Sequence, residues 1–213
     1  MRAALRHPAA WWLLLGLGLS PLTWLVLQAL QDQLGANPAE ALIRATGDWT
    51  LRSLCLVLAV SPLRQLLAWP ELLRFRRMLG LLVFGYASVH LLCYAWFDMG
   101  FDLADTLQDI AKRPFIWLGF SAFVVLLALA ATSFNRAVRW LGGQRWQMLH
   151  RGVYAVAVLA ILHFWWMRAG KQDFAEVSVY AGIVLILLGW RVRRRWLARQ
   201  AGQALAGAGR SGR

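Results

Sequence analysis

Apolar runs of about twenty residues recur along the chain and alternate with short polar stretches. The runs cover residues 9–30, 49–69, 78–97, 115–134, 146–166 and 177–196. A helix of about twenty apolar residues crosses the ~30 Å hydrocarbon core of a bilayer. The pattern therefore predicts an all-α, polytopic membrane protein with a bundle of six transmembrane helices. The first run is longer than the apolar core of a cleaved leader, so it is expected to be a retained span.

Two of the polar stretches predict a structure of their own, one from the spacing of its apolar residues and the other from its composition. Residues 98–114 carry four aspartates, and their apolar residues between 101 and 110 fall close to helical spacing. This spacing predicts a short amphipathic helix on the membrane surface. Residues 199–213 are rich in Gly, Ala and Arg, which predicts a disordered cytoplasmic tail after a transmembrane domain at 1–198.

Composition agrees with a membrane protein, and charge predicts its orientation. Hydrophobic residues make up 60% of the 213 residues, more than a soluble domain of this length would carry. With the N-terminus on side one, that side holds 17 of the 23 Lys and Arg but only one acid, Glu71. The positive-inside rule makes this side cytoplasmic, and six spans put both termini there. Topology thus explains the net charge of +13 without a nucleic-acid partner.

Three of the four histidines lie inside apolar runs, where a titratable side chain is costly and is usually functional. His90 lies in the run 78–97, and His150 and His163 lie in the run 146–166. At 1.5 Å per residue, His90 is ~18 Å and His163 ~24 Å from the cytoplasmic ends of their helices. Two parallel helices would therefore present imidazoles at similar depth. Two neutral imidazole nitrogens suit a haem iron that transfers electrons.

His150 is a weaker candidate, because it lies ~20 Å nearer the cytoplasm than His163. A second haem at that depth would find Arg77 on the opposite helix, and arginine stays protonated and cannot ligate iron. In one continuous helix, the thirteen residues between the two histidines also leave a rotation of about 220°, so the side chains do not share a face. An inner haem is expected to be held by His150 alone or to be absent.

Each candidate residue also has a structural interpretation. The histidines could hydrogen-bond neighbouring helices, and His150 could reach water at the cytoplasmic interface. Arg77 and Arg151 could be topology anchors or could pair with a haem propionate or a flavin phosphate. Arg52 could reach the outer interface or pair with a propionate. A covalently attached haem is excluded, because the sequence has no Cys-x-x-Cys-His motif.

Two segments resemble the ferric-reductase-like transmembrane domain that is shared with NADPH oxidases. They are residues 76–94, RRMLGLLVFGYASVHLLCY, and 141–166, LGGQRWQMLHRGVYAVAVLAILHFWW. The positions that carry the resemblance are Arg77, Gly80, Tyr86, His90, Trp146, Leu149, His150, Arg151, Tyr154 and His163. Length, six spans and the lack of a fused flavin domain are most similar to haem-binding membrane subunits of bacterial periplasmic methionine sulfoxide reductase systems.

The resemblance implies haem b held by His90, His150 and His163, with FMN as a second cofactor. Electrons would come from a cytoplasmic flavin reductase or the quinone pool and pass to a periplasmic molybdopterin enzyme that repairs oxidised methionine. The chain would be an electron-transfer subunit in the lipid of the bacterial inner membrane rather than a self-contained enzyme. The larger oxidases carry a second histidine where this chain has Arg77, which leaves the number of haems open.

Two other functions would use the same histidines. A stand-alone transmembrane ferric reductase would need its own electron donor, and no Gly-x-Gly-x-x-Gly motif for such a cofactor follows a strand. A proton or ion conduit would place acids inside the spans, whereas all ten acids are expected in loops or at span ends. The sequence therefore favours electron transfer.

Overall fold

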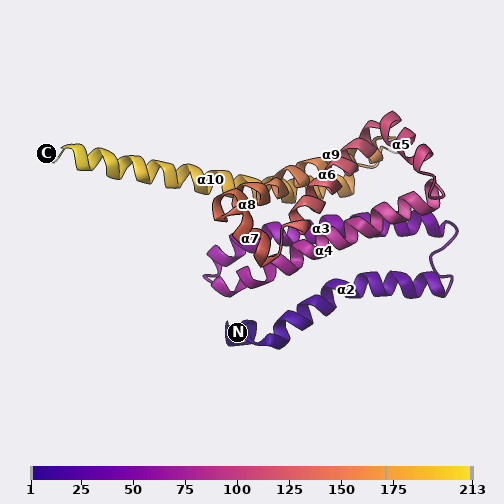
Figure 1. The fold of residues 1–213 in the computed structure, drawn as a ribbon, viewed down its shortest axis with the longest axis horizontal. Coiled ribbons are helices and arrows are strands. Elements are labelled where there is room, and N and C mark those ends of the chain that lie inside the picture. The colour runs from indigo at the N-terminus through magenta and orange to yellow at the C-terminus, as the bar shows by residue number, and fades with distance from the viewer. Residues whose placement is uncertain (1, 171, 212–213) are drawn as a thin grey trace.

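The computed structural model of the chain describes residues 2–170 and 172–211, and all regular structure in these residues is helical (Figure 1). The elements are α1 (Arg2–Arg6), α2 (Pro8–Leu30), α3 (Pro38–Leu66), the 3-10 helix η1 (Pro70–Phe75), α4 (Arg76–Cys93), the π-helical turn η2 (Tyr94–Asp98), α5 (Leu103–Lys112), α6 (Pro114–Ala131), α7 (Asn135–Leu141), α8 (Gly143–His150), α9 (Gly152–Ala169) and α10 (Ala175–Ser211).

The long helices run up and down one bundle whose two ends can be told apart (Figure 1). Helix α1 and the C-terminal part of α10 lie at one end, here called the inner end, and α5 and the α2–α3 connection lie at the outer end. Helix α3 packs chiefly on α4 and α6 on α9, while α4 also contacts α6 and α10 contacts α3 and α9. The largest fully buried apolar side chains between these helices are Leu54, Leu58, Val83, Val156 and Val177.

Five helical segments of the described chain are long and apolar enough to cross a membrane, which confirms the all-helical membrane architecture. They are Pro8–Leu30, Pro70–Asp98, Pro114–Ala131, Gly143–Ala169 and Ala175–Ala201. The predicted span 49–69 is not among them. Its residues form the inner part of α3, a 29-residue helix whose outer part carries Glu40, Arg44 and Asp48. Asp48 therefore lies in a helix of the bundle rather than in the predicted loop.

Helix boundaries differ from the sequence-based prediction at two places. Helix α3 begins at Pro38 rather than at Trp49, because Asn37 caps it by accepting a hydrogen bond from the Glu40 backbone N–H at 3.2 Å. The predicted span 146–166 is interrupted by a turn at Arg151, between α8 and α9. Arg151 itself keeps helical backbone angles, φ −69° and ψ −16°, and α8 and α9 together form the single membrane-length segment Gly143–Ala169.

The two polar stretches with their own pattern are both helical. The predicted amphipathic helix is α5, which begins after Asp102, whose side chain accepts from the Asp105 N–H at 2.9 Å. Helix α10 extends to Ser211 and projects beyond the bundle (Figure 1), and the disordered tail from residue 199 stays a prediction. The alanines, glutamines and arginines of this segment are good helix formers. Residues 212–213 lie outside the described part, and the domain division at residue 198 stays a prediction.

Helix α2 is tied to the bundle at a proline. Because Pro21 has no N–H, the carbonyl of Leu17 lacks its helical partner, and Ser20 Oγ donates to that carbonyl at 2.9 Å. The next carbonyl, of Gly18, accepts from Tyr86 Oη of α4 at 2.7 Å. This bond links α2 to the helix that carries His90.

Replacing Tyr86 by phenylalanine is expected to loosen this link. The substitution leaves the Gly18 carbonyl without its donor, and hydrogen bonds between transmembrane helices contribute about 0.6–2 kcal/mol. We expect the free energy of unfolding to fall by about 1 kcal/mol in a detergent-denaturation titration. Ser88→Ala is the control, because Ser88 Oγ donates only to the Phe84 carbonyl of its own helix. Equal effects of the two substitutions would contradict the inter-helix role of Tyr86.

Candidate functional site

His90 of α4 and His163 of α9 meet in the interior, toward the outer end of the bundle. Their ring centroids are 6.3 Å apart and their planes are inclined by 80°. Metal–imidazole bonds are about 2 Å long, so two imidazoles that bind one metal ion from opposite faces have centroids about 6 Å apart. The two rings therefore lie at the separation that one shared metal ion requires, as expected from their similar predicted depths.

A backbone carbonyl of a neighbouring helix holds each imidazole. His90 Nδ1 lies 2.9 Å from the Ile43 carbonyl oxygen of α3, and His163 Nδ1 lies 2.6 Å from the Phe115 carbonyl oxygen of α6. A carbonyl can only accept, so Nδ1 carries the proton and donates in both rings. In a neutral imidazole Nε2 is then the unprotonated nitrogen, which is the form that binds a metal.

A glycine follows each of these carbonyls by one helical turn. Gly47 follows Ile43 on α3, and Gly119 follows Phe115 on α6. A Cβ at Gly47 would lie 3.1 Å from His90 Cε1, and a Cβ at Gly119 would lie 2.9 Å from His163 Cε1 and Nδ1. Each imidazole thus rests on the same carbonyl-and-glycine arrangement, in which the missing side chain lets the ring approach the backbone.

A cavity of about 220 Å³, here called the outer cavity, adjoins the two rings. Helices α3, α4, α6 and α9 supply its mostly apolar walls, for example Ala87, Phe123, Val156 and Ala160. Its charged or phenolic lining residues are Arg44, Asp48, Tyr94, Asp98, Arg113 and Arg168. Apolar walls with a few convergent polar groups suit a largely apolar ligand that carries polar groups at one edge.

Arg52 is not among the residues that line this cavity. Its Nε donates to Tyr180 Oη of α10 at 2.9 Å, and its guanidinium lies 4.8 Å from the centre of the Trp49 ring. The Tyr180 contact ties α3 to α10. The Arg52 side chain thus lies outside the lining of this cavity, and its pairing with a propionate stays a prediction.

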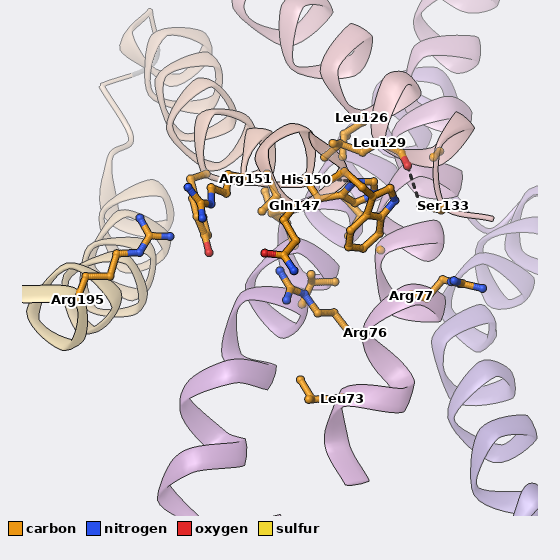
Figure 2. Close-up of a pocket in the computed structure, with 18 residues that line it drawn as sticks. Leu73, Arg76, Arg77, Leu126, Leu129, Ser133, Gln147, His150, Arg151 and Arg195 are labelled. Atoms are coloured by element: carbon orange, nitrogen blue, oxygen red, sulfur yellow. Dashed lines mark hydrogen bonds between the residues drawn. The ribbon is translucent and has the colours of Figure 1, made fainter. Parts of the chain in front are cut away.

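His150 adjoins a second cavity of about 440 Å³, here called the inner cavity (Figure 2). Its ring stacks on Trp146 with centroids 3.9 Å apart, and its Nδ1 lies 3.1 Å from the Trp146 carbonyl oxygen. Its Nε2 is buried and has no hydrogen-bond partner among the described residues. Trp146 Nε1 donates to the Thr132 carbonyl at 2.8 Å, which fixes α8 against the end of α6. His150 therefore has an available ring nitrogen in a well-anchored position.

Four arginines line the inner cavity: Arg76 and Arg77 from α4, Arg151 after α8 and Arg195 from α10 (Figure 2). Arg77 Nη2 donates to Asn135 Oδ1 at 2.8 Å. No acidic side chain is among the described residues that line this cavity. Guanidinium groups bind carboxylates and phosphates through paired hydrogen bonds. The predicted set of His150, Arg77 and Arg151 is thus brought together in a cavity suited to an anionic group.

The two cavities share a wall. Leu54 of α3 and Leu126 of α6 line both of them. These side chains are almost fully buried, at 1% and 6% exposure. A thin apolar layer therefore separates a ligand in the inner cavity from one in the outer cavity.

The orienting groups around the histidines were missed in the sequence. Gly47 and Gly119 could have been noticed only as glycines in helices that face a histidine, which requires knowledge of the helix pairing. Arg44, Arg113 and Arg168 were assigned to connections. Only Arg168 had a signal in the sequence, because it follows His163 by five residues; Arg44 and Arg113 lie near the Ile43 and Phe115 carbonyls, which the sequence does not single out.

Comparison with known proteins identifies the family. Residues 46–161 match the family described as Ferric reductase like transmembrane component. The protein-methionine-sulfoxide reductase heme-binding subunit MsrQ of Polaromonas naphthalenivorans (strain CJ2) is 62% identical over 90% of this chain and 88% of its own length. Proteins of the same name from Herminiimonas arsenicoxydans and Ralstonia nicotianae are 54% and 53% identical, over 89% and 90% of this chain and 87% and 88% of their own lengths. No solved structure matches the chain.

The matched segment contains most of the site described above. His90, His150, Gly47 and Gly119 lie within residues 46–161, and His163 lies two residues beyond them. The transmembrane family and the five apolar helices together show a multi-pass membrane protein. The resemblance found in the sequence is confirmed, and the chain belongs to the ferric reductase like transmembrane component family.

Proposed function

We propose that the chain is the haem b electron-transfer subunit of a periplasmic methionine sulfoxide reductase system. It would pass electrons from a cytoplasmic flavin reductase or a quinol to a periplasmic molybdopterin enzyme that repairs oxidised proteins. The name that the relatives share, heme-binding subunit of protein-methionine-sulfoxide reductase, supports this assignment. The observation that carries it is the pair His90 and His163, with centroids 6.3 Å apart and each Nδ1 tied to a carbonyl.

The residues of the outer cavity fit a haem. Its porphyrin provides four ligands to iron, so two protein nitrogens complete the coordination, and His90 and His163 are the proposed pair. The bound group supplies one-electron chemistry through its iron. The protein holds the two Nε2 atoms in place and surrounds them with apolar walls that exclude water. If His90 and His163 both held the iron, no position would be left open for a substrate, which would suit electron transfer.

The inner cavity is the proposed place of the second cofactor, FMN, or of a haem held by His150 alone. Arg77 and Arg151 would bind the phosphate of FMN or the propionates of such a haem. The absence of lining acids among the described residues supports an anionic ligand there. Because Leu54 and Leu126 line both cavities, electrons would cross only a thin apolar layer to reach the outer one.

The proposed topology has six spans in the bacterial inner membrane, with both termini in the cytoplasm. Helix α3 runs between the outer and inner ends beside α4 (Figure 1). We take it as the additional span that raises the five apolar segments to six. Its polar outer part lines the outer cavity and contacts other helices, so it is not wholly exposed to lipid. Most arginines lie toward the inner end, where α1 and the end of α10 lie, and the positive-inside rule makes that end cytoplasmic.

The direct test is the absorption spectrum of the full chain purified in detergent. The protein is expected to be red, with a Soret band and with α and β bands after reduction. A colourless, iron-free preparation that still supports reduction of methionine sulfoxide by its partner enzyme would refute the haem proposal.

The inner site has its own expected result: replacing both Arg77 and Arg151 by methionine lowers FMN content while the outer haem is retained. Charge-assisted hydrogen bonds contribute about 1.5–3 kcal/mol each, so we expect at least a roughly tenfold loss of FMN. The fluorescence of flavin released by acid measures it. Arg139→Met is the control, because Arg139 is exposed on α7 and does not line the cavity. Unchanged FMN content in the double variant would contradict the assignment.

Measurements on the same purified protein distinguish two alternative functions from the proposed one. A stand-alone ferric reductase would reduce ferric chelates without any partner, given a soluble donor. A proton or ion conduit gains some support from Asp48 and Asp98, which line the outer cavity, but the described lining of the inner cavity continues with arginines instead of acids. A conduit would move protons across vesicles without haem, whereas the proposed subunit would not.

A further inference from the structure

Three arginines from different parts of the chain line the outer cavity toward its outer end. Arg44 lies on α3, Arg113 lies just before α6 and Arg168 lies near the end of α9. Arg168 follows His163 by five residues, so its backbone lies about 7 Å farther toward the outer end. The cavity that adjoins the imidazoles is therefore bounded on this side by positive charge, here called the arginine rim.

Arg168 has a hydrogen-bonding capacity that the protein does not fill. Its side chain is only 11% exposed, and its Nη1 and Nη2 bind Asp173 at 3.3 Å and Glu176 at 3.1 Å. The guanidinium also lies 5.3 Å from the centre of the Phe164 ring. Its Nε is buried and has no hydrogen-bond partner among the described residues. A buried donor of a charged group is unfavourable without an acceptor, so an acceptor inside the cavity would stabilise it.

The other two arginines are held from outside the cavity. Arg44 pairs with Glu40, and Arg113 pairs with Asp109 at 2.8 Å, each acid lying one turn earlier in the chain. Neither acid lines the cavity, whereas both arginines do. The lining of the cavity contains two acids, Asp48 and Asp98, and three arginines. All three rim arginines are therefore paired with acids outside the cavity, and the donor left unfilled among the described rim residues is Arg168 Nε.

We propose that Arg168, supported by Arg44 and Arg113, binds the propionate carboxylates of the haem in the outer cavity; this inference rests on the proposed haem site. The unfilled Nε of Arg168 would donate to a carboxylate oxygen, and a hydrogen bond between a guanidinium and a carboxylate is stronger than one between neutral groups. The charged edge of the haem would then face the outer end, and its apolar edges would contact the walls that include Phe123 and Val156. The arginine rim thus sets which way the haem is inserted between His90 and His163.

The test compares haem b with its dimethyl ester, in which the propionates carry no charge. The full chain is produced without haem, purified in detergent and titrated with either form. Wild-type protein is expected to bind haem b at least tenfold more tightly than Arg168→Gln, while both proteins bind the dimethyl ester equally within twofold. Arg64→Gln is the matched control, because Arg64 lies at the inner end of α3 and lines neither cavity; it should bind both forms as the wild type does.

The outcomes separate the propionate contact from the haem site itself. If Arg168→Gln lost affinity equally for both forms, or for neither, Arg168 would not bind the propionates and the inference would be overturned. If wild-type protein bound neither form, the proposed haem site would fail as well. Should Arg168→Gln not fold, the Arg44→Gln/Arg113→Gln double variant takes its place, and the same loss confined to haem b is expected.

Discussion

Replacing His90 or His163 by alanine is expected to remove the haem of the outer cavity. Each substitution deletes one of the two proposed iron ligands, and no further histidine or cysteine is among the described residues that line the outer cavity. Removing a group that only hydrogen-bonds a metal ligand costs about 10–100-fold in metal affinity, so removing the ligand itself should lower haem content more than tenfold. The ratio of haem to protein, from the pyridine haemochrome spectrum, measures it.

His150→Ala is the matched control for this result. His150 adjoins the inner cavity on the far side of Leu54 and Leu126, so its loss should leave the outer haem in place. Free imidazole added to His163→Gly should restore part of the haem binding, because it can fill the space of the missing ring. If His150→Ala alone removed all haem, the pairing of His90 with His163 would be wrong.

Adding one methyl group at Gly119 is expected to lower haem binding almost as strongly as deleting His163. The new Cβ would lie 2.9 Å from His163 Nδ1 and Cε1, closer than such atoms pack. The ring would have to leave the Phe115 carbonyl, and its Nε2 would then no longer point at its proposed position on the iron. Overpacking costs about 1–3 kcal/mol, which corresponds to about a tenfold loss of haem from Gly119→Ala.

The same reasoning gives an ordered series. Gly47→Ala should have a smaller effect, because its Cβ would lie 3.1 Å from the nearest atom of His90. Gly85→Ala on α4 and Gly182→Ala on α10 should bind haem normally, because nothing outside their own helices lies within 4 Å of a Cβ there. Haem content and the Soret maximum are measured for all four. A Gly119→Ala protein with full haem and an unchanged spectrum would show that this glycine does not seat His163.

The hydrophobic pattern was sufficient for most of the fold, because lipid imposes a minimum length on an apolar run. Helices α2, α4, α6 and α10 cover the predicted runs, and α8 with α9 covers the run 146–166. Helix α3 was predicted only in its apolar half. Its outer half reads as a polar loop, yet Asp48 there lines a cavity, and an Asn37 cap and a proline begin the helix before it.

The histidines could be predicted because helical rise is constant, so counting residues gives depth. The backbone carbonyls that hold the two imidazoles could not be predicted. Every residue has a carbonyl, and only the packing of α3 on α4 and of α6 on α9 selects those of Ile43 and Phe115. The same holds for Arg168, whose charge alone is equally consistent with an anchor at the membrane surface. Its burial and its unfilled Nε distinguish it, and both depend on the folded chain.

Electron paramagnetic resonance of oxidised His150→Ala protein tests the central claim most directly, because that variant keeps only the outer site. If His90 and His163 bind one iron atom from opposite faces, the spectrum should show a single low-spin ferric species, and adding His90→Ala or His163→Ala should abolish it. A high-spin spectrum, or a low-spin signal that survives loss of both histidines, would contradict the account.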